Sequence, residues 1–568
     1  MKPSIAALCA ILLLGNAGYA QPAGLHALDD QAFDTDFAGR TIPIVTGKLI
    51  NISQEEISKT PITYSLVSLV GQVRKTTQVE ADGTFRLQLD YPLPYQQIWL
   101  SVGEMFYTGI YVNKDVHVEV DVQKVKAPGK ELLFNGPGIR FLGTDGPLNE
   151  YTNNFILFRR EEQLALDSRI QQIPRLSKPS AATVQAAYGG IYDSVKMIVD
   201  DYTAKNPSPY AWLLENEYWS EYYGRISVTY WGHEMDAPTL SRLQKHKTYS
   251  VTNSSVGFYR YLSNYFSLVA GRRTKIAWKE VALLPDLTTD EKLAVDSLLM
   301  AERQTAGTAY STGQVAKWTK VAKPRKQRLV DEQLIDNGIR AIDSNFTGGK
   351  ADILKLLLND SKDINEQRYA LEQLMPAMQT AWCNAIARAN YSNTLSKMAA
   401  INKAMSNAGN SMTAADFGKP LVQTAFGASL YKVSNVKGAD FLAGLKKSFP
   451  GKAIVFDLWA TWCAPCLGEM PHSKKLQETS KDLSVVFVYV CTNRGSDEEK
   501  WKRKIGELNL PGVHFFIDEA LDADLSQFFS FSGYPGYAFI DRKGVYKPGA
   551  IKRVSQIPDR AALAALVD

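Results

Sequence analysis

The chain has 568 residues, of which 45% are hydrophobic and 22% charged, and its 64 basic and 59 acidic side chains leave a net charge of +5. This length is too great for one hydrophobic core, so we expect about two to four domains. The composition is that of a globular protein. Because the net charge is small, it gives no indication of a nucleic-acid partner, and we expect none.

The first twenty residues have the pattern of an export signal. Lys2 gives a positive start, Ile5 to Leu14 form a short apolar core, and Gly18-Tyr19-Ala20 places small residues at the cleavage positions. An apolar core this short does not span a bilayer as a helix, and the sequence has no other run of about eighteen apolar residues. We therefore expect a signal peptide at 1–20 and an exported mature protein.

Segment 21–125 has the alternation of β-strands. Val116, Val118 and Val120 alternate with polar residues, which indicates a half-buried strand. Asp82-Gly83 is a hairpin signal and is followed by apolar residues at every second position. Several short strands separated by turns predict a β-sandwich domain over 21–125.

From 126 to 405 the apolar period becomes that of helices. Thr288-Thr289-Asp290-Glu291 is a capping box ahead of an apolar stripe, and we expect two or more helical bundles. The aromatic cluster at 218–223 fits either a groove for peptide or sugar or a core, and aromatic residues at helical spacing favour the core. The small and polar stretch from Ser406 to Ser411 predicts a linker over 406–417.

The last segment, 418–568, alternates strands with helices. We expect strands over 453–458, 484–490, 513–517 and 537–540, helices after residue 463 and over about 498–508, a further strand after the turn at 541–544, and a terminal helix ending near Leu566. The predicted fold class is a multidomain chain with an N-terminal β-sandwich, an α-helical middle region and a C-terminal α/β domain.

Two cysteines, Cys463 and Cys466, lie at the turn between the strand 453–458 and the following helix. At this spacing they can close a small disulfide ring and open it again. The unpaired N–H groups and the dipole of a helix N-terminus favour a thiolate at Cys463. Cys466 lies one turn further in and is expected to act second, releasing a mixed disulfide. Pro465 between them removes one backbone donor and stiffens the turn.

A Cys-x-x-Cys pair can also be half of a zinc site. A structural zinc needs about four ligands, and the sequence has no second such pair and no histidine pair at ligand spacing. We therefore expect no metal and no cofactor. The other two cysteines outside the signal, Cys383 and Cys491, are expected to be small buried residues.

The segment from Phe456 to Cys466 resembles the active-site strand and turn of the thioredoxin superfamily, and its continuation, Leu467 to Pro471, resembles the TlpA/ResA-like branch of exported thiol-disulfide oxidoreductases. The resemblance covers about residues 418–568 and implies a thioredoxin fold there. Segment 21–125 is similar to the β-sandwich that precedes such domains in Bacteroidetes-type proteins. This similarity implies a location in the periplasm or cell envelope of a Gram-negative bacterium.

The resemblance also implies roles for three further residues. Asp457 takes the place of a buried acid that relays protons for the inner thiol, although TlpA-like members more often have Asn there. Glu469 matches an acid held near the dithiol, and Pro535 matches a cis-proline that guides the substrate backbone. Alternatives stay open: Asp457 as a strand acid without a role, Glu469 as a complement to the helix dipole, Pro535 as a trans turn proline.

The favoured hypothesis is an exported protein disulfide reductase in which Cys463 is the nucleophile and Cys466 the resolving thiol. Asp457 and Glu469 are the candidates for proton transfer, and the expected substrate-binding residues are Trp462, Ala464, Pro465, Tyr534 and Pro535.

The resemblance implies two kinds of partner: substrate proteins with disulfides, and a membrane electron donor of the DsbD or CcdA kind. An oxidase or isomerase would use the same residues. A cell-envelope binding protein with the thioredoxin-like domain as a docking module is the alternative from another class.

Overall fold

The computed structural model describes residues 37–60, 62–69, 73–103, 106–125, 138–246, 248, 251–303, 310–359, 364–406, 413–531 and 533–567. The chain divides into two compact units, one up to Tyr391 and one from Ser392 onward. The predicted signal peptide at 1–20 and residues 407–412 of the predicted linker lie outside the described residues. The domain boundaries predicted from the sequence stay predictions.

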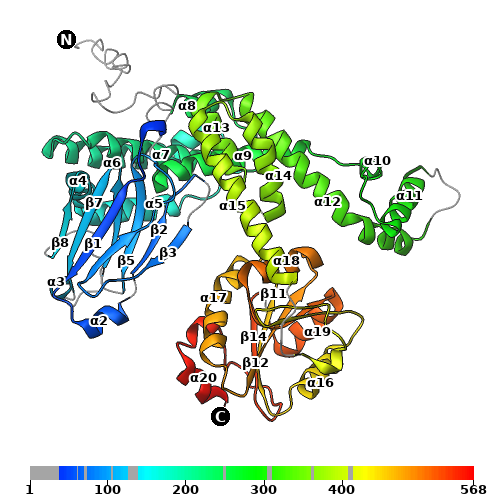
Figure 1. Ribbon diagram of the computed structural model, residues 1–568. Helices are drawn as coiled ribbons and strands as arrows, with labels where there is room; N and C mark the ends of the chain where they lie inside the picture. The colour runs from blue at the N-terminus through cyan, green and yellow to red at the C-terminus, as the bar shows by residue number, and fades with distance from the viewer. Residues whose placement is uncertain are drawn as a thin grey trace, which may run out of the picture. The chain divides into compact units, whose positions relative to one another are not determined.

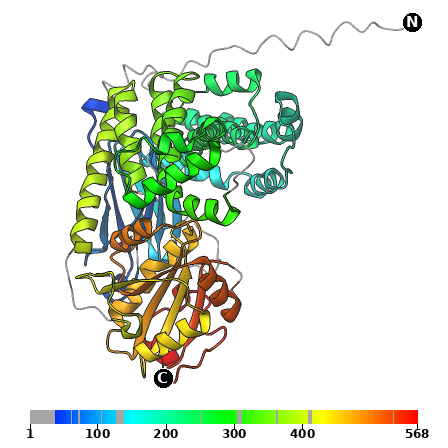
Figure 2. The same ribbon diagram turned by 90° about the vertical axis from the view of Figure 1, so that its right-hand side faces the viewer.

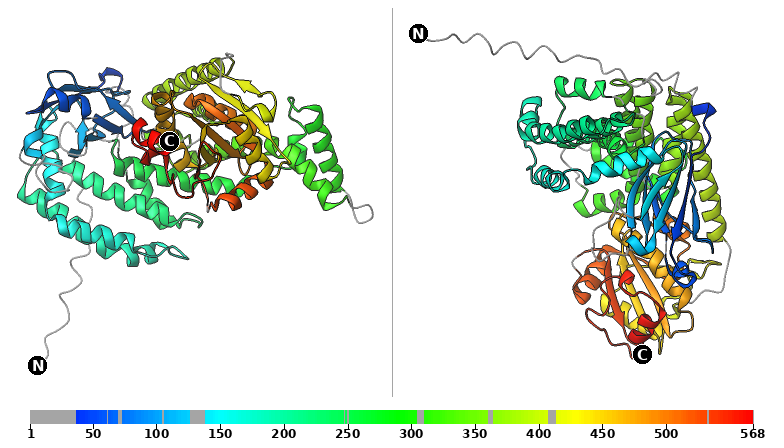
Figure 3. Two further views of the ribbon diagram at one scale, coloured as in Figure 1. Left: turned by 90° about the horizontal axis from the view of Figure 1, so that it is seen from below. Right: turned by 90° about the vertical axis from the view of Figure 1, so that its left-hand side faces the viewer.

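Two four-stranded sheets occupy the N-terminal part of the first unit, and their strands are drawn in blue to cyan in Figure 3. The strand orders are β4-β1-β7-β8 and β3-β2-β5-β6, with β1 and β7 parallel and the other pairs antiparallel. Residues of both sheets, among them Val118 and Leu100, belong to one buried apolar cluster. The strands are β1 (Ile44–Ile50), β2 (Ile62–Leu66), β3 (Val73–Thr77), β4 (Thr84–Leu87), β5 (Gln96–Val102), β6 (Phe106–Val112), β7 (Asp115–Asp121) and β8 (Ile139–Leu142).

The middle of the chain is helical, as the apolar period predicted (Figure 1). The capping box is confirmed, because Glu291 N donates to Thr288 Oγ1 at 3.3 Å and Thr288 N donates to the Glu291 carboxylate at 2.8 Å. Tyr218 and Tyr222 are buried in the main apolar cluster of this unit, as expected for core aromatics. Within the described residues, no helix combines the length and apolar character that a membrane span requires.

The helices of this first unit, including two short ones near the sheets, have the following bounds: α2 (Gln54–Lys59), α3 (Val122–Val125), α4 (Gly146–Leu157), α5 (Arg160–Gln171), α6 (Ala181–Lys205), α7 (Ala211–Thr229), α8 (Ala237–Lys245), α9 (Asn253–Arg273), α10 (Trp278–Val281), α11 (Thr289–Arg303), α12 (Thr312–Asp343), α13 (Gly348–Leu357) and α14 (Ile364–Ala377). Helix α15 (Ala381–Ser406) contains the point at which the chain passes from the first unit to the second.

The second unit contains a six-stranded sheet with the order β14-β11-β12-β13-β10-β9. The four inner strands are parallel, and β14 and β9 pair antiparallel at the two edges. Strand bounds are β9 (Val422–Gln423), β10 (Ala428–Val433), β11 (Ala453–Trp459), β12 (Val485–Thr492), β13 (Gly512–Ile517) and β14 (Gly536–Ile540).

One predicted strand of this sheet is wrong. After the turn at 541–544 the chain makes only an isolated bridge between Ile540 and Tyr546. Pro548 follows shortly afterwards, and because proline has no N–H to donate, it cannot extend the pairing.

Helices cover both faces of this sheet, as Figures 1 and 2 show. Buried residues of α17 (Ala464–Thr479), α18 (Glu498–Leu508) and α20 (Arg560–Val567) share one apolar cluster with one face of the sheet. Those of α16 (Gly438–Ser448) and α19 (Glu519–Phe529) share another cluster with the opposite face. Two single turns of 3-10 helix, η1 (Ala415–Phe417) and η2 (Val554–Gln556), complete the unit.

Replacing Phe515 by Ala is expected to destabilise the second unit by about 3 to 5 kcal/mol. The Phe515 ring is fully buried and lies 4.7 to 5.2 Å from the rings of Phe417, Phe441 and Tyr431. Hydrogen exchange of peptides from β11 and β12 in the full-length protein measures the effect as lost protection. Phe528→Ala is the control, since that ring is 56% exposed, and equal losses in both variants would contradict the burial argument.

Candidate redox site

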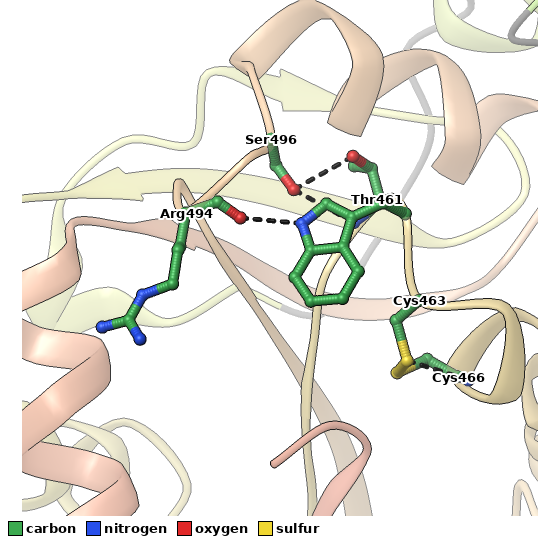
Figure 4. Close-up of a disulfide and its surroundings, with 6 residues drawn as sticks. Thr461, Cys463, Cys466, Arg494 and Ser496 are labelled. Atoms are coloured by element: carbon green, nitrogen blue, oxygen red, sulfur yellow. Dashed lines mark hydrogen bonds between the residues drawn. A yellow bond between two sulfur atoms is a disulfide. The ribbon is translucent and has the colours of Figure 1, made fainter. Parts of the chain in front are cut away.

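The two motif cysteines form a disulfide at the point where β11 passes into α17 (Figure 4). All seven residues of β11 are buried, so the strand fixes the position of the turn that follows it. Cys463 is the N-cap of α17, and its Sγ accepts the backbone N–H of Cys466 at 3.2 Å. Cys463 is 4% exposed and Cys466 is fully buried. The outer sulfur is therefore the one near the surface, at a helix end that favours negative charge.

The active-site turn is held by the loop that follows β12. Thr461 donates from its backbone N and from its Oγ1 to Ser496 Oγ, at 3.1 and 3.0 Å. The indole Nε1 of Trp462 donates to the carbonyl oxygen of Arg494 at 2.8 Å. Gly495 lies between these two anchors with φ +68, and a Cβ added there would lie 2.8 Å from the indole nitrogen. The loop can approach the indole this closely because residue 495 is glycine.

The loop containing Pro535 lies beside the same turn. The Tyr534–Pro535 peptide bond is cis, as the resemblance implied. The Tyr534 ring packs edge-on against Trp462, with ring centroids 5.7 Å apart. Its hydroxyl donates to Asp522 Oδ2 at 2.7 Å. Burial, together with this hydrogen bond to a carboxylate, raises the pKa of Tyr534 to about 12.

Asp457 lies in the interior of the sheet, with 1% of its surface exposed. It is aligned with Tyr489 on β12 and with Tyr537 on β14, and within the described residues neither of its oxygens has a hydrogen-bond partner. Burial, and secondarily the negative charge of Glu469, raises the pKa of Asp457 well above its usual range. The carboxyl group therefore holds a proton under conditions in which an exposed aspartate would be ionised.

Glu469 lies half-buried in the second turn of α17. Its carboxylate accepts the backbone N–H and the hydroxyl of Ser555, at 2.8 and 2.9 Å. Because its charge acts on Asp457, the two acids are close enough to be coupled electrostatically. Glu469 is thus a partly exposed acid whose negative charge adds to the raised pKa of the buried Asp457.

The other predicted substrate-binding residues lie around the disulfide. Trp462 is 55% exposed, and Ala464 and Pro465 are exposed in the first turn of α17. Tyr534 and Pro535 are half-buried. Trp462, Ala464 and Pro465 are thus exposed beside Cys463 in the chain, and the Tyr534 ring, which precedes cis-Pro535, packs against Trp462.

Several contributors to this site were missed from the sequence: Arg494, Ser496, Asp522, Tyr489 and Tyr537. A signal did exist for Arg494 and Ser496. They directly follow β12, and because β12 is parallel to β11, the two strands end on the same side of the sheet. The tyrosines are polar groups within apolar strands, and nothing local marks their alignment with Asp457. Cys383 and Cys491 are buried, as expected, and within the described residues neither belongs to a disulfide.

A disulfide at a helix N-terminus, beside a cis-proline loop and near a buried acid, is a dithiol–disulfide redox site. Within the described residues, no three or more His, Cys, Asp or Glu side chains are grouped so as to hold a metal ion.

Comparisons with known proteins agree with this class of site. Residues 435–558 match the sequence model of the Redoxin family. Thioredoxin-like protein YneN of Bacillus subtilis (strain 168) is 30% identical over 107 residues, which are 18% of this chain and 61% of that protein. Thioredoxin from Coprinus comatus is 40% identical over 47 residues, which are 8% of this chain and 44% of that protein. The chain thus spans less than two thirds of the length of either relative.

Among solved structures, the crystal structure of the thioredoxin domain of a thiol-disulfide oxidoreductase from Bacteroides vulgatus is similar. It is 23% identical, covers 22% of this chain and 84% of its own chain, and has a TM-score of 0.20. From the Redoxin match and the site together, the C-terminal part of this chain is a redoxin, or thioredoxin-like, domain of the thiol-disulfide oxidoreductase kind.

Replacing Asp457 by Asn is expected to stabilise the oxidised protein increasingly as the pH rises above about 4. Because the pKa of Asp457 is raised in the folded state, its pH-dependent contribution to stability is fully present below its unfolded pKa and is lost as the pH rises toward its folded pKa. Between the unfolded and the folded pKa of Asp457, the difference in the free energy of unfolding between the variant and the wild type should grow by up to about 1.4 kcal/mol for each pH unit. Hydrogen exchange of β11 peptides at several pH values measures it, and a difference independent of pH would contradict the buried-acid assignment.

Gly495→Ala is expected to slow disulfide exchange at Cys463 several-fold, since the new Cβ forces the loop or the indole to move. Gly468→Ala, in α17, is the matched control because a Cβ there meets nothing within 4 Å. A helical glycine replaced by alanine should stabilise the helix by up to about 1 kcal/mol. Stopped-flow fluorescence of the reaction with a model disulfide would show whether only the Gly495 variant is slowed; similar rates in the two variants would exclude a role for the tight contact.

Proposed function

We propose that this protein is an exported thiol-disulfide oxidoreductase of the TlpA/ResA-like branch, which reduces disulfides in other proteins with the Cys463–Cys466 pair. The observation that carries the proposal is the position of this pair. Its outer sulfur lies at the N-terminus of α17 near the surface, and its inner sulfur is fully buried. Such an arrangement favours attack by one cysteine and resolution by the other.

In the reductive cycle the Cys463 thiolate attacks one sulfur of a substrate disulfide. A bond forms between Cys463 and that sulfur, and the other substrate sulfur leaves as a thiolate, which takes a proton. The Cys466 thiol then loses its proton and attacks Cys463 Sγ, which releases the second substrate sulfur as a thiol. Two electrons pass from the dithiol to the substrate, and the protein is left with the Cys463–Cys466 disulfide.

Asp457 and Glu469 are the candidates for handling the proton of the inner thiol. Asp457 is held protonated by burial, and Glu469, which reaches the surface, acts on it electrostatically. In the proposed cycle Asp457 first passes its own proton to Glu469, which releases it to solvent, and the Asp457 carboxylate so formed takes the Cys466 proton as that thiol attacks. Substrate backbone binds along Tyr534 and cis-Pro535, beside Trp462, Ala464 and Pro465.

The remaining parts of the proposal concern location and partners. Segment 1–20 directs export to the periplasm or cell envelope of a Gram-negative bacterium, and a membrane protein of the DsbD or CcdA kind returns electrons to the dithiol. The two N-terminal sheets form a β-sandwich domain, which is supported by their shared buried cluster.

Two alternatives to the reductase differ from it in testable ways. An oxidase or isomerase shares the site but has a more oxidising dithiol. The midpoint potential of the purified mature protein, measured in a glutathione or dithiothreitol buffer, separates these functions, because thioredoxin lies at about −270 mV and DsbA at about −120 mV. A cell-envelope binding protein with the C-terminal domain as a docking module would show no titratable dithiol.

Cys463→Ser and Cys466→Ser are expected to fail at different steps. Without Cys463, reduction of insulin should fall to the rate of uncatalysed exchange, since the attacking thiolate is lost. Without Cys466, the protein should accumulate a mixed disulfide that non-reducing electrophoresis detects, because nothing resolves it. Cys383→Ser, which alters a buried cysteine of the first unit outside the motif, is the control. Undiminished insulin reduction by the Cys463 variant would refute the proposal.

A further inference from the structure

The backbone of a cationic residue, Arg494, contacts the aromatic residue that precedes the nucleophile. The backbone of Arg494 is fixed there, since its carbonyl oxygen accepts the Trp462 indole N–H at 2.8 Å and its own N–H donates to Thr492 Oγ1 at 3.1 Å. Figure 4 shows its side chain leaving the loop that carries Ser496. Trp462 is directly bonded to Cys463, so the position of Arg494 is set relative to the reacting sulfur.

The guanidinium is also tied to the cis-proline loop. Its Nη2 lies 3.7 Å from Asp522 Oδ2, the same oxygen that accepts the Tyr534 hydroxyl at 2.7 Å. Asp522 therefore holds both a residue beside the active-site turn and the residue before Pro535. Arg494 is thereby held on the rim between the two segments that are proposed to bind substrate.

This ion pair presents its positive end to solvent. The Asp522 side chain is 3% exposed, whereas the Arg494 side chain is 56% exposed. A guanidinium has five N–H donors. Within the described residues, the Arg494 guanidinium pairs with one carboxylate oxygen, Asp522 Oδ2, and their distance of 3.7 Å is longer than a hydrogen bond. Donors thus remain for a carboxylate that arrives from solvent, and the planar fork of arginine fits such a group in two parallel hydrogen bonds.

The other predicted substrate-binding residues with a described position near Trp462 carry no charge. Trp462, Ala464, Pro465 and Tyr534 are aromatic or small uncharged residues. Of the acids near the site, Asp457 and Asp522 are buried, and both oxygens of Glu469 are bonded to Ser555. Among the residues named here, the Arg494 guanidinium is therefore the exposed charge that a substrate carboxylate meets.

Resting on the proposed function, we propose that Arg494 is a specificity-determining residue that selects substrate disulfides with an acidic side chain close to the cystine in the peptide chain. The substrate class is then an acidic, cystine-containing protein segment. Its sulfur reaches Cys463 while its carboxylate binds the guanidinium on the far side of Trp462.

The test uses the full-length mature protein, reduced with dithiothreitol that is then removed. It is mixed with excess of three cystine peptides that differ only in flanking residues: glutamate, glutamine or lysine. Quenched-flow alkylation of free thiols gives the second-order rate constant for oxidation of the protein by each peptide. The wild type should react about two- to fivefold faster with the glutamate than with the glutamine peptide, the range of an exposed ion pair. It should react more slowly with the lysine peptide, and the differences should shrink as salt is added.

Arg494→Gln should bring the ratio of glutamate to glutamine rate constants close to one. Because this ratio is taken within one protein, a general loss of activity cancels from it. Arg494→Lys keeps the charge without the fork and should retain part of the preference. Lys543→Gln is the matched control. It removes an exposed cation at the other end of β14, roughly 20 Å away along the strands, and should keep the wild-type ratio.

The outcomes separate this inference from the function on which it rests. If the wild type reduces all three peptides equally, or if the preference persists in Arg494→Gln, the assignment of Arg494 is overturned while the oxidoreductase function stands. If the reduced wild type reacts with none of the peptides, the proposed function itself fails. A ratio that falls equally in Lys543→Gln would assign the preference to net charge and not to Arg494.

Discussion

The parallel alignment of β11 and β12 is the constraint on which the candidate site depends. Because both strands run in the same direction and are paired from Ala453 with Val485 to Trp459 with Cys491, they end at the same edge of the sheet. The active-site turn and the loop of Arg494 and Ser496 follow these two ends and lie against each other. The antiparallel strand β14 begins at that edge, which brings cis-Pro535 there as well. Residues about thirty and seventy positions apart thus meet around one disulfide.

A second constraint is the burial of titratable groups in the sheet, on β11 and its two neighbouring strands. The interior around Asp457 contains tyrosine rings from both neighbouring strands, and burial with the nearby acid raises the pKa of Tyr489 and Tyr537 well above the usual value. Phenols and a carboxyl that all stay neutral cost far less to bury than ions would. A buried acid without a hydrogen-bond partner among the described residues is unfavourable for folding, and such a group is a reason to look for a chemical role.

In the first unit, buried polar side chains provide hydrogen bonds to the backbone of an edge strand. Strand β6 is an edge strand, and α4 covers its outer side. Asn149 accepts from the backbone N of Tyr111 and donates to its carbonyl, at 2.7 and 2.8 Å, and Asn153, one turn later, donates to the carbonyl of Gly109 at 3.1 Å. Two buried amides at helical spacing thus replace the hydrogen bonds that another strand would provide. These contacts keep the sheet edge from exposing unpaired backbone groups.

The sequence by itself determined the redox chemistry and most of the local structure. Cys463 and Cys466 at a strand-to-helix junction, the period-two pattern around Val118 and the capping box at Thr288 are local signals, since each depends on residues a few positions apart. Only the tertiary structure brought Arg494 to Trp462, Asp522 to Tyr534 and Tyr537 to Asp457. The short strands β9 and β10 and the failed strand after residue 544 also depended on sheet partners distant in sequence. Pairing between distant segments leaves no mark on local periodicity, so the groups that surround the dithiol became visible only in the folded chain.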